Sequence, residues 1–319
     1  MPPPLPADPK RPAVRLTNVT KTFGPHTAVN HLSLEVPRGC TYGFIGPNGS
    51  GKTTTIRTIL HIFHPDSGEV EVLGERSTRA ANDRIGYLPE ERGLYKKMTV
   101  RRVLAYYAAL KGMDRADAAS EIQRWLAKMG LTEWADKKVE ALSKGMAQKI
   151  QFIAAVIARP ELLILDEPFS GLDPVNLEVL RAAILELRAA GTTIIFSTHD
   201  MAMAETMCDF IFMIYRGNKV LDGTLADIQR SYGEDTIRVS CAGGAELLRS
   251  LPGVELVRDL GQSQELRHAD AQALLRDLAA RTTVRHFEVC KPSLHDIFIR
   301  IAKPDLQEMQ VPKTTGGGS

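Results

Sequence analysis

GPNGSGKT, residues Gly46 to Thr53, is the stretch that decides the fold, because an apolar run, TYGFI, precedes it and a helical pattern follows it. Its glycines let the backbone turn N–H groups toward one anion, and a helix N-terminus adds a favourable dipole. The lysine can reach β- and γ-phosphates, and the following threonine can hold Mg²⁺. A glycine-rich turn without a ligand is the simpler alternative. The strand–loop–helix context favours a phosphate-binding loop. Its candidate residues are Gly46, Pro47, Asn48, Gly49, Ser50, Gly51, Lys52, Thr53 and Thr54.

Strands and helices alternate around this loop. Short apolar runs at residues 41–45, 162–165 and 193–197 predict strands of a buried parallel sheet. Residues 14–19 and 32–36 alternate between apolar and polar side chains and predict a half-buried antiparallel pair. Helical periodicity predicts helices at residues 52–63, 100–110, 118–129, 147–158 and 176–189. The middle helices are not interleaved with strands and predict a helical lobe over about residues 90–140.

A second unit is expected from residue 233. Its patterns follow in the order strand, helix, strand, strand, helix, strand, which is the order of a ferredoxin-like module. Ser293 and Asp296 then form a predicted capping box for a final short helix. We therefore expect a proline-rich disordered tail at residues 1–13, one domain at 14–232, a second at 233–302 and a flexible tail at 303–319.

Composition limits the class of protein. The 319 residues are 44% hydrophobic, and 40 Lys and Arg stand against 38 Asp and Glu, which gives a net charge of +2. The basic residues form no dominant block, so no nucleic-acid partner is expected. Four widely spaced cysteines show no metal-ligand spacing and fit a reducing cytosol. No apolar run approaches the ~20 residues needed to cross a bilayer, and the proline-rich N-terminus lacks the apolar core of a signal peptide, so we expect neither feature.

LLILDEP and STHD supply the other polar groups that a nucleotide site needs. Asp166 ends an apolar strand, where it can support Mg²⁺, and Glu167 follows, where it can orient or deprotonate water. Helix capping is the alternative for this pair of carboxylates. His199 follows the next buried strand, at the carboxyl end where ligands bind in parallel sheets, and we expect it to contact the γ-phosphate.

The order of GPNGSGKT, YLPEE, LSKGM, LLILDEP, SGLD and STHD resembles the nucleotide-binding domain of ATP-binding cassette (ABC) proteins over about residues 14–232. The resemblance implies an α/β fold: a P-loop NTPase core with a mixed sheet, an antiparallel β subdomain and a helical subdomain. The module at 233–302 adds a small α+β ferredoxin-like domain. The resemblance also implies Walker A at the phosphate loop, Walker B at Asp166 and Glu167, a D-loop ending at Asp173, and a switch histidine at His199. Phe23 falls where the family stacks an aromatic ring on adenine; an ordinary apolar strand residue is the alternative.

LSKGMAQK begins a second predicted anion-binding helix. In the ABC family, the matching signature segment (Leu142 to Gln148) binds the γ-phosphate of ATP held by the opposite subunit. A helix that begins near Gly145 presents free N–H groups, and Ser143 adds a hydroxyl. A helix cap without a ligand is the alternative. The resemblance therefore implies a second ATPase subunit, and we expect a homodimer.

Three residues depart from the commonest family pattern. Lys144 replaces a glycine, Met146 replaces a glutamine, and Glu90 stands where many relatives carry a glutamine that contacts Mg²⁺. A carboxylate can still ligate Mg²⁺ directly or through water, so Glu90 joins Thr53 and Asp166 as a metal candidate. Together with the C-terminal module, these variants resemble the ATPases of exporters of the sodium-extrusion and drug-resistance type.

The expected function is ATP hydrolysis that powers a separate integral-membrane transporter subunit from the cytoplasmic face of the cell membrane. ATP and Mg²⁺ are the expected cofactors. One rival is an ATPase that acts on ribosomes or nucleic acid, but such relatives usually carry two cassettes or a long coiled coil, and neither pattern occurs here. A second rival is a regulatory module that binds ATP without hydrolysis, which would need neither Glu167 nor His199.

Overall fold

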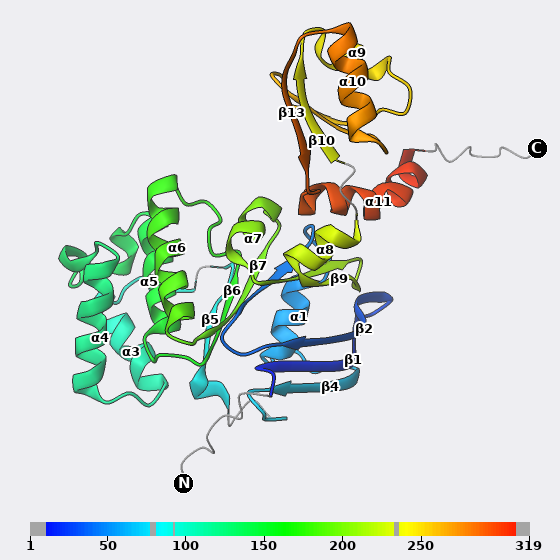
Figure 1. The fold of residues 1–319 in the computed structure, drawn as a ribbon. Helices are drawn as coiled ribbons and strands as arrows, with labels where there is room; N and C mark the ends of the chain where they lie inside the picture. Colours follow the sequence, from blue (N-terminus) through cyan, green and yellow to red (C-terminus); the bar gives the residue numbers. More distant parts are fainter. Residues whose placement is uncertain (1–10, 77–80, 92, 233–235, 311–319) are drawn as a thin grey trace, which may run out of the picture. The chain divides into compact units, whose positions relative to one another are not determined.

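The computed structural model describes residues 11–76, 81–91, 93–232 and 236–310. The chain divides into two units, Met1–Gly223 and Thr224–Ser319. In Figure 1 the first unit runs from blue to green and the second from yellow to red. Within the described part of the chain, no helix has both the length and the apolar character needed to cross a membrane.

A six-stranded sheet with the order β5-β6-β7-β3-β8-β9 forms the centre of the first unit. Its strands are β3 (Thr41–Ile45), β5 (Ile85–Leu88), β6 (Leu162–Asp166), β7 (Thr193–Thr198), β8 (Phe210–Tyr215) and β9 (Asn218–Thr224). The first five strands in that order pair in parallel. β3, β6 and β7 are buried along their whole length, as their continuous apolar runs predict. Because they are parallel, the segments that follow them leave from one edge of the sheet.

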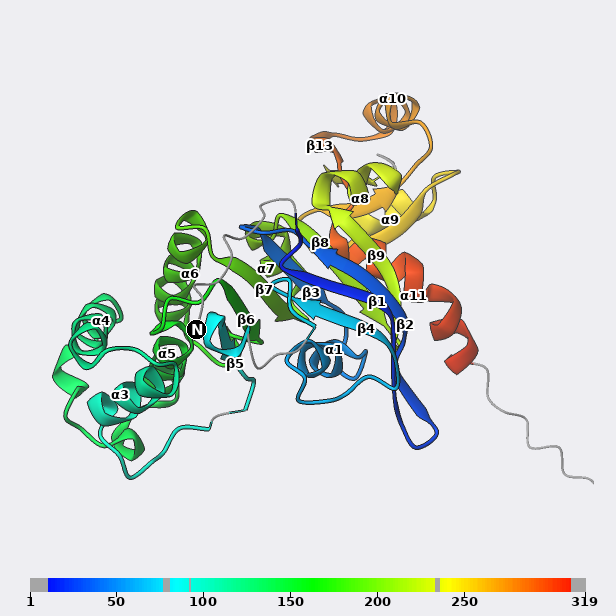
Figure 2. The same ribbon diagram turned by 90° about the horizontal axis from the view of Figure 1, so that it is seen from below.

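A smaller antiparallel sheet, in the order β2-β1-β4, belongs to the same unit (Figure 2). It consists of β1 (Val14–Phe23), β2 (His26–Val36) and β4 (Ser67–Val72). Ala13, which was expected in the disordered tail, is fully buried, and its N–H donates to the Val36 carbonyl. Residues 1–10 of that predicted tail lie outside the described residues.

The helical lobe contains α3 (Val100–Leu110), α4 (Arg115–Lys128) and α5 (Lys144–Val156), with short 3₁₀ turns η2 (Thr132–Trp134) and η3 (Val139–Ala141) between them. The Trp125 ring of α4 packs edge-on against Phe152 of α5, with ring centroids 5.8 Å apart. α1 (Lys52–Ile59), η1 (Asn82–Arg84), α6 (Pro174–Ala189) and α7 (Met201–Met207) complete the first unit. α1 stops short of the predicted residue 63 because the N–H groups of Ile62 and Phe63 both bond back to the Arg57 carbonyl.

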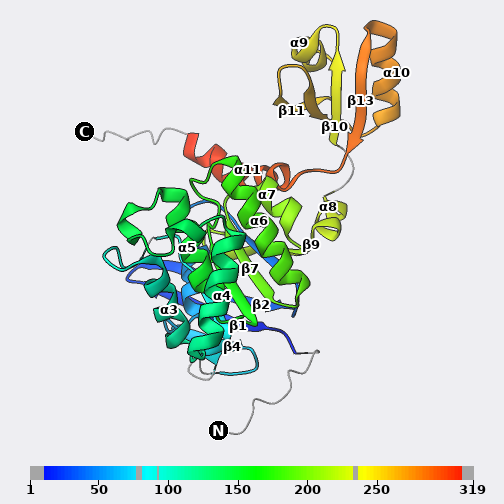
Figure 3. The ribbon, with the colours of Figure 1, turned by 90° about the vertical axis from the view of Figure 1, so that its left-hand side faces the viewer.

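The second unit has the predicted ferredoxin-like order β10, α9, β11, β12, α10, β13 (Figure 3). Its antiparallel sheet has the order β11-β12-β10-β13. The strands are β10 (Thr236–Cys241), β11 (Glu255–Asp259), β12 (Gln264–Arg267) and β13 (Val284–Cys290), and the helices are α9 (Gly244–Arg249) and α10 (Ala271–Arg281). Leu248 of α9 and Leu274 of α10 share one buried core with Ile237 and Val239 of β10. The predicted α+β module is confirmed.

Two helices differ from the predicted domain limits. α8 (Leu225–Ser231), which the sequence assigned to the first domain, belongs to the second unit, where Gln229 Nε2 donates to the Pro292 carbonyl at 3.0 Å. α11 (Leu294–Gln310) continues past residue 303, where the flexible tail was expected. Ser293 and Asp296 form the predicted capping box at its start: the Ser293 hydroxyl accepts from the Asp296 N–H at 3.2 Å, and the Asp296 carboxylate accepts from the Ser293 N–H at 3.2 Å.

Candidate nucleotide-binding site

The phosphate-binding loop lies between the buried strand β3 and helix α1. Gly51, with φ at 114°, stands at the N-cap of α1, and its carbonyl accepts the Thr55 N–H at 2.8 Å. A Cβ on Gly46 would lie 2.3 Å from the Ile214 carbonyl oxygen, and one on Gly51 would lie 2.4 Å from that of Ala28. Both positions therefore require glycine, because neighbouring backbone fills the space of a side chain.

Lys52 is 5% exposed, and its ammonium group lies inside the loop. Lys52 Nζ donates to the carbonyls of Gly46 at 2.7 Å and Pro47 at 3.1 Å. Burial lowers the pKa of Lys52, while the nearby carboxylates of Glu167, Asp166 and Glu90 act in the opposite direction. The lysine thus lies near the three carboxylates that are predicted to belong to the site.

A cavity of about 450 Å³ brings most of the predicted residues together. Its lining includes the predicted residues Phe23, Asn48, Gly49, Gly51, Lys52, Thr53, Thr54, Glu90 and Glu167. Phe23, the last residue of β1, is 44% exposed and packs edge-on against Phe63, with ring centroids 5.3 Å apart. The phosphate loop and an exposed aromatic ring therefore share one cavity, which is the arrangement that a nucleotide base and its phosphates require.

Asp166 ends β6 and is 1% exposed. One carboxylate oxygen, Oδ1, accepts a hydrogen bond from the Ser197 hydroxyl. The other, Oδ2, is buried and has no hydrogen-bond partner among the described residues. A buried carboxylate oxygen without a partner raises the free energy of the folded protein, and a bound cation, or water bound to a cation, would supply the missing partner. The donor set of Thr53, Asp166 and Glu90 fits the oxygen ligands that Mg²⁺ prefers.

Glu167 and His199 lie in direct contact, although 32 residues separate them in the sequence. Glu167 Oε1 accepts from the His199 backbone N–H at 2.9 Å and contacts His199 Nδ1 at 2.8 Å. Because an ionised carboxylate only accepts hydrogen bonds, Nδ1 is the donor, and Nε2 is left for another partner. Glu167 has a φ of 49°, a left-handed conformation that is rare outside glycine. The His199 side chain is 57% exposed, whereas that of Glu167 is 10% exposed.

Ser143, Gly145 and Asp173 do not line the cavity. Ser143 is the N-cap of α5, and its hydroxyl accepts the Met146 N–H at 3.2 Å. Asp173 is the N-cap of α6: its Oδ1 accepts the Asn176 N–H at 3.0 Å, and this bond lowers the pKa of the carboxyl. A Cβ on Gly145 would lie 3.4 Å from Asn176 Nδ2, so the two helix N-termini are adjacent. The structure gives Ser143 and Asp173 capping roles and leaves both exposed.

Sequence reasoning missed two kinds of residue at this site. His26 and Ala28, from the start of β2, line the cavity beside Phe23. The Gly24–Pro25 pair indicates a turn that brings the chain back toward Phe23, and this signal could have predicted the position of His26 and Ala28. Gln148 and Gln151 of α5 bond to the loops that carry Glu167 and Glu90, and no sequence pattern indicates these contacts.

Comparison with known proteins identifies the family. Residues 29–170 match the ABC transporter family model, and residues 223–302 match the C-terminal domain of DrrA1-3-like ATP-binding proteins. An uncharacterized ABC transporter ATP-binding protein of Bacillus subtilis (strain 168), YhaQ, is 43% identical over 287 residues, which cover 89% of this chain and 96% of YhaQ. Nod factor export ATP-binding protein I of Burkholderia lata is 34% identical, with 91% of this chain and 97% of the relative covered.

A solved structure, that of an ATP-binding subunit of an ABC transporter, has the same fold. It superimposes with a TM-score of 0.65 at 30% sequence identity and covers 69% of this chain and 93% of its own. The ABC ATPase fold expected from the sequence is thereby confirmed, and so is the resemblance to exporter-type ATP-binding proteins with a C-terminal domain. The chain belongs to the ABC transporter family, as an ATP-binding protein and ATPase that carries a DrrA1-3-like C-terminal domain.

Proposed function

We propose that the chain hydrolyses ATP as one of two ATPase subunits of an exporter and drives a separate membrane-spanning subunit. The observation that carries the proposal is the cavity that gathers Phe23, Lys52, Thr53, Glu90 and Glu167. It combines an aromatic surface for a base, a cation for phosphates and carboxylates for Mg²⁺ and water. The export relative named above supports the direction of transport.

Lys52 and the loop glycines bind the triphosphate in this proposal. Lys52 Nζ exchanges its bonds to Gly46 and Pro47 for bonds to phosphate oxygens, which are stronger acceptors for a cation. The N–H groups at the start of α1 face the same anion. Thr53, Asp166 and Glu90 would hold Mg²⁺ directly or through water, and bound Mg²⁺ would neutralise charge on the β- and γ-phosphates.

Glu167 prepares the attacking water, and His199 contacts the γ-phosphate. The Glu167 carboxylate can accept a proton from water, and its bonds to His199 fix its position. With Nδ1 donating to Glu167, the exposed imidazole presents Nε2 away from that bond. A protonated ring then donates to a phosphate oxygen. These catalytic groups favour hydrolysis over the rival of ATP binding without turnover.

A second copy of the chain completes the site. Ser143, Gly145 and Asp173 lie outside their own chain's cavity and near the surface, where another subunit's nucleotide can reach them. α5 begins at Lys144, so its first N–H groups and positive dipole end are available at this surface. ATP between two subunits would therefore contact the phosphate loop of one chain and the signature segment of the other.

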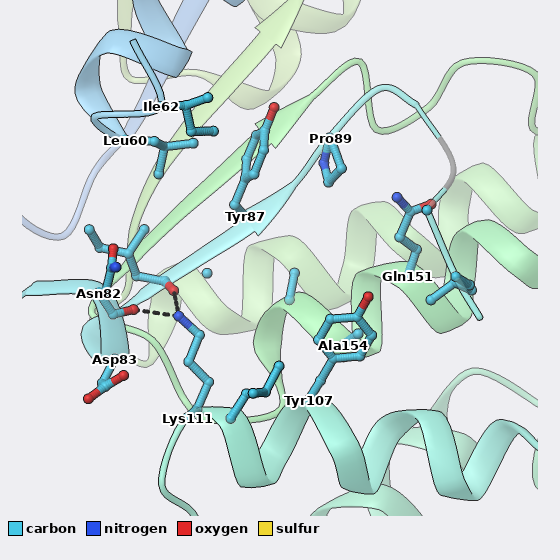
Figure 4. A pocket seen from close by; sticks show the side chains of 16 residues that line it. Leu60, Ile62, Asn82, Asp83, Tyr87, Pro89, Tyr107, Lys111, Gln151 and Ala154 are labelled. Atoms are coloured by element: carbon cyan, nitrogen blue, oxygen red, sulfur yellow. Dashed lines mark hydrogen bonds between the residues drawn. The ribbon is translucent and has the colours of Figure 1, made fainter. Parts of the chain in front are cut away.

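A cavity at the base of the helical lobe is the proposed docking site for the membrane subunit (Figure 4). It measures about 560 Å³, and its lining includes Leu60, Ile62, Tyr87, Tyr107, Leu110 and Gln151. Of these lining residues, Ile62 is 56% exposed and Leu110 is 58% exposed. Two further exposed rings, Tyr95 and Tyr106, do not line the cavity and pack edge-to-face, with ring centroids 5.5 Å apart. An apolar surface of this kind commonly marks a protein interface. Binding there would hold the chain at the cytoplasmic face of the membrane.

Co-purification tests the proposal against the nucleic-acid rival. The full-length chain is extracted with detergent from its native cells through an affinity tag, and the recovered partners are identified. Recovery of a multispanning membrane protein supports the proposal, and exchange of exposed Leu110 for Glu should reduce that recovery. Recovery of ribosomes or nucleic acid in its place contradicts the proposal.

A further inference from the structure

Two buried glutamines lie on one face of the signature helix α5. Gln148 is 7% exposed and Gln151 is 8% exposed. Three positions apart, they are neighbours on the helix surface. Their side chains lie within the first unit, and Figure 4 shows Gln151 directed toward the loop that follows β5.

Each glutamine donates to a loop that carries a carboxylate of the candidate site. Gln148 Nε2 bonds to the carbonyl of Pro168, the residue directly after Glu167. Gln151 Nε2 bonds to the carbonyl of Glu91 at 3.0 Å, directly after Glu90. A carbonyl that loses its hydrogen-bond donor loses a contact that holds its loop against the helix, so α5 and the two loops are expected to move together.

α5 is packed firmly enough to transmit a displacement. Ile150, Phe152, Ile153 and Val156 are at most 1% exposed, and Phe152 contacts the buried Trp125 ring. At about 1.5 Å of rise per residue, Gln148 lies roughly 7 Å and Gln151 roughly 12 Å along the axis from the N-cap Ser143. A shift of the helix N-terminus therefore reaches both glutamines as a rigid-body movement.

We propose that Gln148 and Gln151 are positioning residues that couple the two ATP sites of the dimer. The inference rests on the proposed function, in which Ser143 of one chain serves the ATP of its partner. A phosphate contact at the start of α5 then moves the helix, and the two glutamines pass this movement to the carbonyls of Pro168 and Glu91. The adjacent carboxylates, Glu167 and Glu90, are thereby positioned in that chain's own site. Occupation of one site thereby favours the catalytic arrangement of the other, which is positive cooperativity.

The rate of ATP hydrolysis by the full-length chain, measured against ATP concentration, tests this coupling. Gln148→Met and Gln151→Met keep the length of the side chain and remove its donor. The Hill coefficient should fall from well above 1 to about 1, and kcat should fall about five- to tenfold, with a smaller change in KM. Gln151→Lys, which keeps an N–H donor, should recover part of the cooperativity. Gln123→Met, at an exposed position of α4 in the same lobe, is the matched control.

The outcomes separate the coupling from the function on which it rests. Unfolding midpoints from calorimetry show that each variant is folded, and if Gln148→Met is not, Gln151→Met decides alone. A Hill coefficient near 1 in the wild type, or one unchanged in the folded Met variants, overturns the coupling. If Ser143→Glu lowers activity while the Met variants behave as wild type, only the coupling fails. If Ser143→Glu has no effect, the proposed dimer site fails as well.

Discussion

Asp166 and Glu167 are adjacent in the sequence, yet their carboxylates have different surroundings. Asp166 has one oxygen that accepts from the Ser197 hydroxyl and one that has no hydrogen-bond partner among the described residues, whereas Glu167 is bonded to His199 through both the backbone and the ring. The left-handed backbone at Glu167 turns the chain sharply just after β6. Strained backbone at such a place is typical of functional sites. The difference in contacts supports separate roles, a metal ligand for Asp166 and a water-activating base for Glu167.

The proposed role of Glu167 predicts the behaviour of Glu167→Gln. Glutamine keeps the size of the side chain and removes the negative charge that accepts a proton, so ATP should still bind while hydrolysis falls by about 10² or more. An ATP-bound dimer should then accumulate, because the step that separates the subunits is blocked. Turnover assays and size-exclusion chromatography with ATP measure the two effects.

Glu91→Gln is the matched control for that experiment. Glu91 is exposed, follows Glu90 in the same loop and does not line the nucleotide cavity. Its substitution should leave turnover nearly unchanged, because Gln151 bonds to the backbone carbonyl of Glu91, which the substitution keeps. Normal hydrolysis in Glu167→Gln would remove Glu167 from the catalytic role.

At the scale of residues, the sequence predicts which side chains belong to the site better than it predicts their contacts with one another. The glycine spacing of the phosphate loop predicts Lys52 and Thr53, because local backbone geometry requires those residue types. The bond between Glu167 and His199 joins the ends of β6 and β7, so it depends on the pairing of two strands. The contact between Gln151 and Glu91 spans 60 positions of sequence, so it also depends on tertiary packing.

At the scale of elements, α5 and β5 pack so closely that no side chain fits between them at Gly86. Gly86 of β5 faces the C-terminal part of α5, and a Cβ there would lie 2.2 Å from the Ala155 carbonyl oxygen. The same atom would lie 3.0 Å from side-chain atoms of Leu163 and Pro160. Because backbone cannot yield as a flexible side chain does, β5 and α5 keep a fixed separation.

This packing predicts that Gly86→Ala destabilises the first unit. The added methyl group forces α5 away from the sheet, and overpacking of this kind costs about 1–3 kcal/mol of unfolding free energy. Urea denaturation measures the loss. Gly93→Ala, where a Cβ would have no atom within 4 Å, is the control and should change stability little. Equal stability of the two variants would contradict the close packing of these elements.

The signature helix also predicts complementation between subunits. One protomer carries Lys52→Ala and the other Ser143→Glu, so each homodimer has two damaged sites. If the motifs of opposite chains share a site, the mixed dimer has both lesions in one site and leaves the second intact. Mixing should then restore up to about half of the wild-type ATPase activity per dimer.

Two controls make the mixing experiment decisive. Differently tagged protomers show that mixed dimers form, and a wild-type dimer with one disabled site shows that a single site can turn over. Given both results, mixed dimers no more active than either parent would mean that Ser143 does not complete its partner's site.

Element types were predictable from periodicity, while several ends depended on capping. α3 has its predicted bounds, whereas α5 begins three residues before residue 147, at Lys144, because the Ser143 hydroxyl caps it. β4 was not predicted, since SGEVEV is short and mostly polar on its own. It becomes a strand through pairing with β1, which single-sequence patterns do not contain.

In the whole molecule, the two units have separate cores and separate sheets. α8 is held within the second unit by Gln229, and the Arg300 guanidinium of α11 donates to the Tyr232 carbonyl at 2.8 Å. The division therefore falls before α8, near residue 223, where the C-terminal family match also begins. The sequence predicted both modules but set the division later, because α8 has no pattern that assigns it to either side.

This division predicts the result of truncation. A chain that ends at Gly223 should fold and bind ATP, because the cavity lies wholly in the first unit. We expect its ATP-dependent dimer to be about tenfold weaker if the second unit stabilises the dimer, a loss of about 1.4 kcal/mol. Analytical ultracentrifugation of the Glu167→Gln background with ATP measures the dimer constant. An unchanged constant would exclude a dimer-stabilising role for the second unit.

The packing of Trp125 against Phe152 has a practical consequence for observing the ATPase cycle. The chain has two tryptophans, Trp125 and Trp134, and both lie in the helical lobe. Intrinsic indole fluorescence is therefore a label-free optical reporter of this lobe, and the second unit contributes no indole emission. Arg124 and Lys128 lie 4.8 Å and 5.2 Å from the Trp125 ring centroid, so a change in their placement alters the field at the chromophore. A shift in emission when nucleotide is added would record a change within the helical lobe in real time.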